Sequence, residues 1–438
     1  MTSTENAVRL WRVPHYPTWF VSDSAKELAA GLLHFAVPLI ALMVTGSPAQ
    51  AGVIGAVGVV TSLLFTLWGG VLADRHRRPA LMLLGALLGV ALAATFAVFD
   101  RLSALSFGAL LVLNVLFNAR DGLFDVAGEA ALKQVVPDEA MGRAQAANQG
   151  RGAAIQLAGG PLGGALLAVG GWLVALAAAG IYLLSAATAV MLRHSNRLAG
   201  TPSPDADTAV AAMRRNPVSE IGEGFSWLFS RIDLRGVLWV AMLANLGFNS
   251  AITTVIYSLQ QAGHSPIIIG TVSAVLGAVM LVGALVAPLL VPRLSGGAIV
   301  IASLLMCTLG TIVLPAVRAV PAIMIVVGAA VFLVPALNSA LMGYFMVAVP
   351  TELLGRANSA FRVFSMGAMP LAPLIAGLGL SWAGRTGTLV LCAVLTAVAG
   401  LLAVLNRGLR SLPAESGWAA HADAFSLSRR DGAGMHDA

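Results

Sequence analysis

The sequence predicts an all-α membrane protein in which twelve transmembrane helices form two related bundles of six. The first reason is composition: 58% of the 438 residues are hydrophobic, 11% are charged, and the mean hydropathy is +0.86. In soluble domains about a quarter of the residues are charged. The second reason is a repeat, because Val136–Ala144 returns 213 positions later as Val349–Ala357, both reading Val-Pro-x-Glu-x-x-Gly-Arg-Ala. Two equivalent helical halves can rock around a shared site, so transport is the leading hypothesis.

Each predicted span is a mainly apolar run of roughly 18 residues or more, which can cross about 30 Å of hydrocarbon as a helix. In chain order the runs cover residues 22–43, 50–72, 79–99, 104–124, 145–168, 172–192, 235–257, 267–291, 297–317, 320–343, 358–380 and 386–405. They divide the chain into a cytoplasmic N-terminal segment (1–18), a six-helix bundle (19–193), a cytoplasmic linker (194–234), a second six-helix bundle (235–406) and a disordered cytoplasmic tail (407–438).

Within the linker, Ile221, Phe225 and Leu228 recur at helical spacing. This pattern predicts either a helix lying flat at the membrane surface or a soluble connector helix.

Loop charges predict the topology. Most of the 26 Lys and Arg residues fall in loops on the side of the N-terminus, whereas Arg101, Arg318 and Arg385 fall on the other side. The positive-inside rule therefore places both termini in the cytoplasm. Basic residues spread over many loops also argue against nucleic-acid binding, which needs them on one soluble face. The abundance of Arg and Ala over Lys favours a bacterial source and hence the bacterial cytoplasmic (inner) membrane.

No motif for enzymatic chemistry accompanies these spans. Cys307 and Cys392 fall inside apolar runs, and neither of the two lysines, Lys26 and Lys133, follows a phosphate-binding loop. We therefore expect no catalytic residue, no cofactor and no bound metal, and a monomer in the lipid bilayer that moves a small-molecule substrate. The energy would come from a gradient of protons or of another coupling ion.

Charged residues inside the spans gather in the N-terminal half. Each costs about 2.5 to 3.5 kcal/mol at mid-membrane and is seldom kept without a partner or a wet cavity. The predicted cluster comprises Asp23, Lys26, Glu27 and His34 on the first span, Arg120 and Asp121 on the fourth and Arg151 on the fifth, while the C-terminal half has Arg362. Asp23, Glu27 and His34 are 4 and 7 residues apart, so they share one helix face, which we expect to line a cavity.

The mechanistic hypothesis is that Glu27, or less favourably Asp23, exchanges a proton with substrate, and that His34 joins the relay. Structural alternatives stay open for each group. Asp23 could be solvated at the interface, Lys26 could pair with Asp23, His34 could be a hydrogen-bonded helix residue, and Arg120 with Asp121 could be a structural pair.

The C-terminal half offers amides in place of charges. Its candidate cavity residues are Asn245 and Asn249 on the seventh span and Asn338 on the tenth. Met342, Phe345 and Met346 supply adaptable apolar surface there or pack in the core. Charge on one side and apolar walls on the other suit an amphiphilic substrate.

The loop after the second span reads Gly70-Val-Leu-Ala-Asp74-Arg75-His-Arg77-Arg78 and resembles the signature loop of the major facilitator superfamily, with Arg77 and Pro79 departing from the usual pattern. The resemblance implies a latch between the halves. Gly70 would allow close helix approach, while Asp74 would accept hydrogen bonds from the start of the eleventh span and pair with Arg75 or Arg78. Alternatively, these arginines only set topology.

The fifth span contains Gly159-Gly160-Pro161-Leu-Gly163-Gly164, which resembles the antiporter motif of proton-coupled exporters but is one residue shorter between proline and the glycine pair. It can act as a hinge or as a packing groove. Leu123-Phe-Asp125 followed by the repeated segment is similar to the macrolide and siderophore exporter branch, and the Pro-Glu-Ser-Pro-Arg motif of sugar importers is absent. The resemblance implies proton-coupled efflux of a drug, siderophore or secondary metabolite; the alternative is an importer or facilitator of a nutrient.

Overall fold

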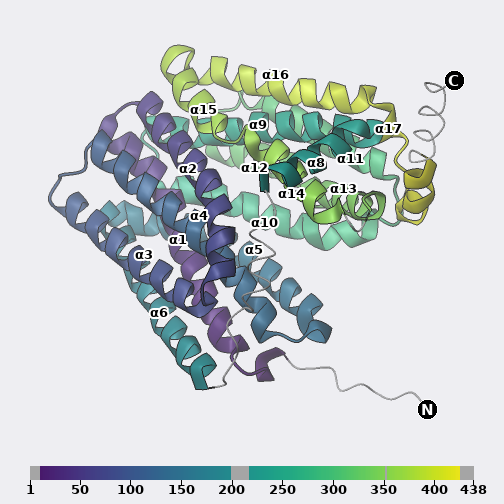
Figure 1. Ribbon diagram of the computed structural model, residues 1–438. Helices are drawn as coiled ribbons and strands as arrows, with labels where there is room; N and C mark the ends of the chain where they lie inside the picture. Colours follow the sequence, from purple (N-terminus) through teal and green to yellow (C-terminus); the bar gives the residue numbers. More distant parts are fainter. Residues whose placement is uncertain (1–9, 199–216, 351–352, 425–438) are drawn as a thin grey trace. The chain divides into compact units, whose positions relative to one another are not determined.

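The computed structural model describes residues 10–198, 217–350 and 353–424, and the regular elements in this part of the chain are all helices (Figure 1). Twelve spans in the described residues are long and apolar enough to cross a membrane, which confirms the predicted fold class. The first six spans are α1 (Tyr16–Thr45), α2 (Pro48–Arg75), α3 (Arg78–Arg101), α4 (Phe107–Val135), α5 (Asp138–Val169) and α6 (Gly171–Leu198).

The remaining helices begin with α8 (Pro217–Ser230), which precedes the seventh span, and end with two short elements after the twelfth. They are α9 (Ile232–Gln261), α10 (Pro266–Leu290), α11 (Gly296–Val313), α12 (Val320–Val331), α13 (Val334–Ala348), α14 (Leu354–Gly367), α15 (Leu371–Trp382), α16 (Gly384–Leu405), α17 (Arg407–Arg410) and the 3₁₀ turn η3 (Glu415–Gly417). α12 with α13 forms the tenth span and α14 with α15 the eleventh. Pro335 and Pro370 lie at these two interruptions, where proline removes a helical hydrogen bond.

The chain folds into two compact units. The first comprises residues 1–213 with the short segment Leu259–Ala274. In it α2 packs on α4, α3 packs on α4 and α6, and α1 packs on α4, α5 and α6. The inserted segment is held by Gln260, whose Nε2 donates to the backbone oxygen of Leu39 at 2.6 Å. The boundary therefore differs from a simple division at the linker, because the turn between α9 and α10 belongs to the first unit.

The second unit comprises residues 214–258 and 275–438. α11 packs against α12, α13 and α16, and α8 packs along α14. Leu228 of α8 is fully buried in the core of this unit, and the rings of Phe225 and Phe229 make T-shaped contacts with Phe364. The helix predicted in the linker is thus present and is packed on protein through its apolar face. The side chain of Ile221 lies outside the described part.

The repeated segment occupies equivalent junctions. Val136 ends α4 before α5, and Val349 ends α13 before α14, each donating its backbone N–H to the carbonyl oxygen four residues earlier. Ala144 and its counterpart Ala357 are both fully buried. The same sequence therefore makes the same helix-to-helix connection in each unit, as expected for a duplicated bundle.

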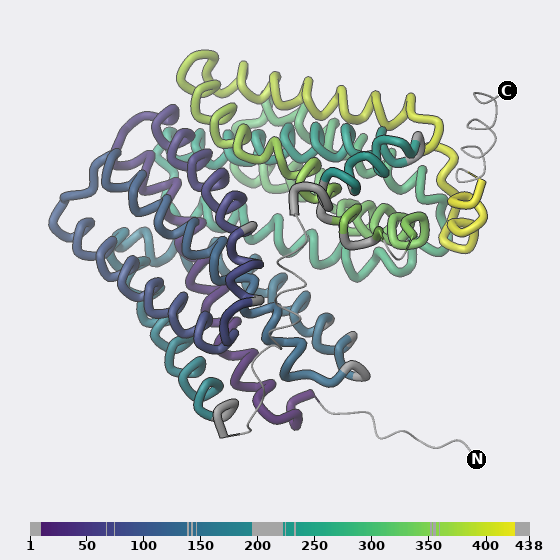
Figure 2. Tube along the Cα trace, in the orientation of Figure 1, coloured from purple at the N-terminus to yellow at the C-terminus, as the bar shows by residue number. Residues whose placement is uncertain are grey.

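Residues 407–424 differ from the disordered tail expected for 407–438. They fold back on the second unit, as the yellow end of the trace shows (Figure 2). Leu412 and Trp418 join the buried cluster of α13 and α14. The N–H groups of Gly296 and Gly297 donate to Pro413 and Leu412. Leu409, Leu412 and Trp418 bury apolar side chains against the unit, although the composition of residues 407–438 is polar overall. Residues 425–438 lie outside the described part.

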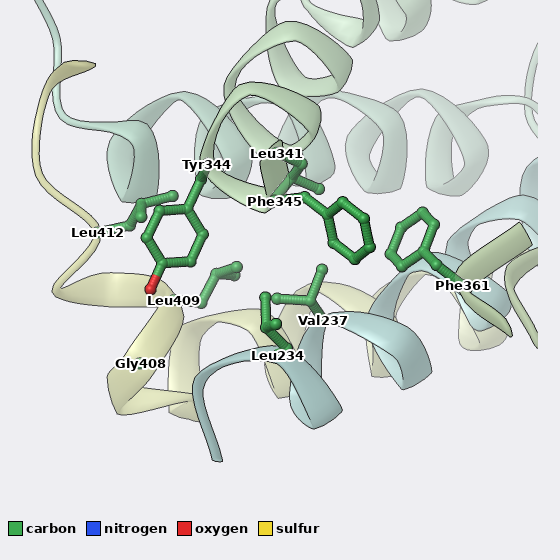
Figure 3. A pocket seen from close by; sticks show the side chains of 9 residues that line it. All are labelled: Leu234, Val237, Leu341, Tyr344, Phe345, Phe361, Gly408, Leu409 and Leu412. Carbon is green, nitrogen blue, oxygen red and sulfur yellow. The ribbon is translucent and has the colours of Figure 1, made fainter. Parts of the chain in front are cut away.

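A small cavity of about 20 Å³ lies under this C-terminal segment, with room for about one water molecule. Its walls are mainly apolar, and Figure 3 shows the rings of Tyr344, Phe345 and Phe361 facing the leucines across it. The cavity is too small for an organic substrate. Phe345 is thus a core residue, whereas Met342 and Met346 are exposed.

Candidate substrate and proton site

The charged residues of the spans come together where α1 and α4 lie side by side in the first unit. Trp19 fixes this contact, since its indole Nε1 donates to the backbone oxygen of Gly128 at 2.9 Å. Gly128 has no room for a side chain, because an added Cβ would collide with Oδ1 of Asp23. The charge cluster consists of Asp23, Lys26, Glu27 and His34 of α1, Arg120, Asp121 and Asp125 of α4 and Arg151 of α5.

Lys26 lies at the centre of the charge cluster. Its Nζ is 3.2 Å from Asp23 Oδ1, 3.4 Å from Glu27 Oε1 and 3.1 Å from Asp125 Oδ1. Three carboxylates from two helices therefore share one ammonium. The pairing of Lys26 with Asp23 that the sequence left as an alternative is present, and Lys26 also contacts two further acids.

Asp23 is held from its other side by Arg151, whose Nη1 lies 2.8 Å from Oδ2. The guanidinium of Arg151 is also within 6 Å of the ring centres of Trp19 and Phe20, at 5.8 and 5.7 Å. Asp23 is 3% exposed and touches two cations. It is therefore a fixed counter-ion in this structure, and the alternative that it is solvated at the interface does not fit.

Arg120 anchors the other end of the charge cluster. It pairs with the neighbouring Asp121, its Nε donates to the backbone oxygen of Gly85 at 2.8 Å, and its Nη1 donates to the hydroxyl of Tyr182 at 2.9 Å. Gly85 lies directly against Phe124, which allows α3 to approach α4 closely enough for this bond. Arg120 and Asp121 thus form the structural pair that the sequence left open.

His34 extends the charge cluster to an exposed surface. Its Nε2 lies 3.4 Å from Asp121 Oδ2, so the imidazole contacts the buried pair of Arg120 and Asp121. Its side chain is 60% exposed.

The three permanent cations of the charge cluster are buried, whereas two of its acids are more exposed. The side chains of Arg120, Lys26 and Arg151 are 2%, 11% and 12% exposed, whereas those of Glu27 and Asp125 are 43% and 46% exposed. The carboxylates of Glu27 and Asp125 therefore lie closer to the surface than the buried cations. A positively charged group reaching this face of the first unit meets the two acids first.

Asp125 belongs to the charge cluster and Tyr182 contacts it through Arg120, although the sequence did not single them out as site residues. Asp125 was visible only as part of a family motif, yet it follows Asp121 by four positions and so shares its helix face. Tyr182 carried no signal, because a lone tyrosine in an apolar span does not indicate which cation it meets.

The loop after α2 is only partly described. The side chain of Asp74 lies outside the described part, so its latch role remains a prediction. Arg78 reaches α4, where its Nη1 donates to the backbone oxygen of Ala130 at 2.7 Å, and Arg75 is exposed. Among the described residues nothing lies within 4 Å of a Cβ placed on Gly70, so its role in a close helix approach stays a prediction. Within the first unit, the close approach to α4 is made by Gly69 against Gly122.

The glycine motif of α5 is a packing surface. Gly163 faces Phe35 of α1, Gly160 faces Ser273 of α10, and Gly164 lies against the backbone of Pro266. α5 continues as a helix through Pro161. The structure thus favours the packing groove over a hinge, and the residues that contact the motif belong to the first unit.

The asparagines predicted for the second unit form a short ladder. Asn249 Nδ2 donates to the backbone oxygen of Asn245 at 2.8 Å, and Asn245 Nδ2 donates to that of Ser365 at 3.4 Å. Asn338 is exposed. In the described residues of both units, no group of three or more His, Cys, Asp or Glu side chains is arranged to hold a metal ion.

Comparison with known proteins agrees with this architecture. The family model described as Major Facilitator Superfamily matches residues 27–373. The crystal structure of a D-xylose-proton symporter superposes with a TM-score of 0.61 at 14% identity, over 91% of this chain and 98% of that one. The crystal structure of a bacterial homologue of the iron transporter ferroportin, in an inward-facing state, superposes with a TM-score of 0.71 at 14% identity, over 92% and 100%.

At such low identity these structures show the fold alone, and a search of curated protein sequences gives no significant match. The family model covers most of the chain, including α4, α5 and the part of α1 from Glu27 onward, with six of the eight charge-cluster residues; Asp23 and Lys26 precede the matched segment. The chain therefore belongs to the major facilitator superfamily.

Proposed function

We propose that the protein is a proton-coupled exporter, which moves an amphiphilic small molecule out of the cell by alternating access. Superfamily membership supports secondary transport, and the charge cluster supports the choice of the coupling ion. The macrolide and siderophore exporter branch, to which the sequence bears resemblance, supports outward transport.

Charge balance in the charge cluster is the observation that carries the proposal. Four carboxylates, Asp23, Glu27, Asp121 and Asp125, face three permanent cations, Lys26, Arg120 and Arg151, and the remaining member is His34. With every acid ionised and the imidazole neutral, one negative charge is left over. An uncompensated charge in a span costs about 2.5 to 3.5 kcal/mol. The charge cluster is therefore balanced when it holds one proton.

The proton has three accessible carriers. Glu27, Asp125 and His34 are the exposed members, whereas Asp23 and Asp121 are enclosed by cations. A proton on Glu27 or Asp125 weakens their attraction to Lys26, and a proton on His34 strengthens its attraction to Asp121. Glu27 thus keeps the role that the sequence predicted, and Asp125 joins it.

The test is flux into inverted membrane vesicles, whose lumen is acidified before substrate is added. A panel of lipophilic drugs, dyes and siderophores identifies the substrate by comparison with vesicles that lack the protein. We expect uptake that stops when the pH gradient is collapsed. Import by proton symport is the alternative and would deplete the lumen instead.

Glu27→Gln should abolish gradient-driven uptake while substrate still binds. Glu129→Gln is the matched control, because Glu129 is an exposed acid of α4 outside the charge cluster. Uptake that does not depend on the pH gradient, or that continues in Glu27→Gln at the wild-type rate, would show that the charge cluster takes no part in coupling.

A further inference from the structure

The ammonium of Lys26 occupies a site shaped for a cation. Asp23, Glu27 and Asp125 surround it at 3.1 to 3.4 Å. We call these three carboxylates the cradle. The Oδ1 atom of Asp23, a residue that is 3% exposed, faces Lys26 at 3.2 Å. Gly128 of α4 lies against this oxygen and has no side chain that would collide with it.

Lys26 is held differently from the two arginines of the charge cluster. Arg120 is bound through three groups in α3, α4 and α6, and Arg151 is bracketed by Asp23 and two aromatic rings. Lys26 contacts carboxylates through a single compact ammonium at the end of a flexible side chain. Such an ion pair dissociates more readily than the planar, multiply bonded contacts of an arginine. Of the cations in the charge cluster, Lys26 is the one whose contacts in the described residues are carboxylates alone.

The exposed side of the cradle has a negative surface. Glu27 and Asp125 are accessible, while the cationic groups around them are buried. An incoming cation therefore approaches two carboxylates, and an anion is repelled. Because both acids already attract Lys26, a second cation competes with that ammonium.

We infer that the cradle is a cation-exchange site in which Lys26 is a built-in competitor that a monovalent, amphiphilic organic cation displaces. This inference rests on the proposed function and names the substrate class. Cation binding adds a positive charge to a cluster that is already neutral with its one proton. That proton then leaves for solvent from Glu27, Asp125 or His34, under the combined field of Asp23, Asp121, Arg120 and Arg151. When the cation departs, Lys26 returns and prevents its rebinding.

The chain offers a direct test because it contains only two lysines, Lys26 and Lys133. Lys133 is exposed near the end of α4 and outside the charge cluster, so Lys133→Arg leaves Lys26 as the single lysine. The purified variant in detergent is treated with an amine-reactive reagent, and modification of the Lys26 peptide is followed by mass spectrometry. Tetraphenylphosphonium is the probe, tetraphenylborate is its anion of matched shape, and sodium chloride tests a simple cation.

We expect tetraphenylphosphonium to raise the rate of Lys26 modification at least tenfold, with no increase from tetraphenylborate or sodium chloride. Lys26→Met should bind tetraphenylphosphonium at least tenfold more tightly, because the competitor is gone. Failure of the probe to bind, a rate that is unchanged or reduced when it binds, or an equal response to the anion would overturn the inference. An equal response to sodium would replace the organic cation by an alkali ion and overturn it too.

These outcomes are separate from those of the flux experiment. Gradient-driven uptake with no change at Lys26 would leave proton coupling standing and reject the cradle. Displacement of Lys26 without gradient-driven uptake would retain the cradle and reject the proposed function.

Discussion

Replacing Arg120 with methionine should strongly destabilise the first unit. The substitution removes a guanidinium that is 2% exposed and bonds Asp121, Gly85 and Tyr182. It leaves Asp121, whose side chain is 9% exposed, with His34 as its remaining partner among the described residues, at 3.4 Å. Breaking a buried ion pair from one side costs about 3 to 5 kcal/mol, because the other charge stays buried. Methionine fills the space of the arginine stem, so packing loss adds little.

The double variant Arg120→Met with Asp121→Leu separates charge from packing. Removing both charges replaces the pair by apolar groups of similar size, which is often neutral, so we expect stability within about 1.5 kcal/mol of wild type. Tyr182→Phe removes one hydrogen bond to a charged group and should cost about 1.5 to 3 kcal/mol.

The measurement is reversible unfolding in mixed micelles of increasing dodecyl sulfate content, followed by tryptophan fluorescence. A single variant that loses less than about 1 kcal/mol would contradict the reasoning from buried charge. A double variant as unstable as the single one would show that Arg120 acts through packing instead.

Two further pairs of substitutions test the packing. Gly128→Ala should lower the melting temperature and weaken substrate binding, because its methyl group collides with Asp23. Gly70→Ala is the control, since no described atom lies within 4 Å of the added methyl group, and it should leave both quantities unchanged within error. Equal effects of the two substitutions would contradict the geometry. Trp418→Ala should destabilise the second unit by about 3 to 5 kcal/mol, since Trp418 is 6% exposed. Trp382→Ala, at an 82% exposed position, should change the unfolding free energy by less than about 0.5 kcal/mol in the same titration.

The fold was predictable because hydropathy and the repeat are long-range signals. The ends of the helices were less predictable. The fourth apolar run was expected to end at residue 124, but α4 continues to Val135. Hydropathy marks only the part of a helix that suits the hydrocarbon core of the bilayer, whereas the helix itself can continue beyond that core into polar surroundings. The folded segment with Trp418 was missed for a related reason, since a few apolar residues at the right positions suffice to dock a polar stretch.

The candidate site was predictable in its location but not in its pairings. Seven charged residues of the spans mark the region, and all seven lie in the charge cluster. Which cation meets which acid depends on helix rotation and depth, so the link from Lys26 to Asp125 could not be derived from spacing. Gly69 and Gly70 show the same limit, because adjacent glycines face different neighbours and only the structure tells which one packs.

The most direct test of the central claim is to count the protons released when the purified protein binds tetraphenylphosphonium in weakly buffered detergent. The charge balance predicts release of close to one proton for each cation bound, with the release lost when Glu27→Gln and Asp125→Asn are combined. Binding of the cation without release of a proton would contradict the claim that the charge cluster exchanges protons for substrate.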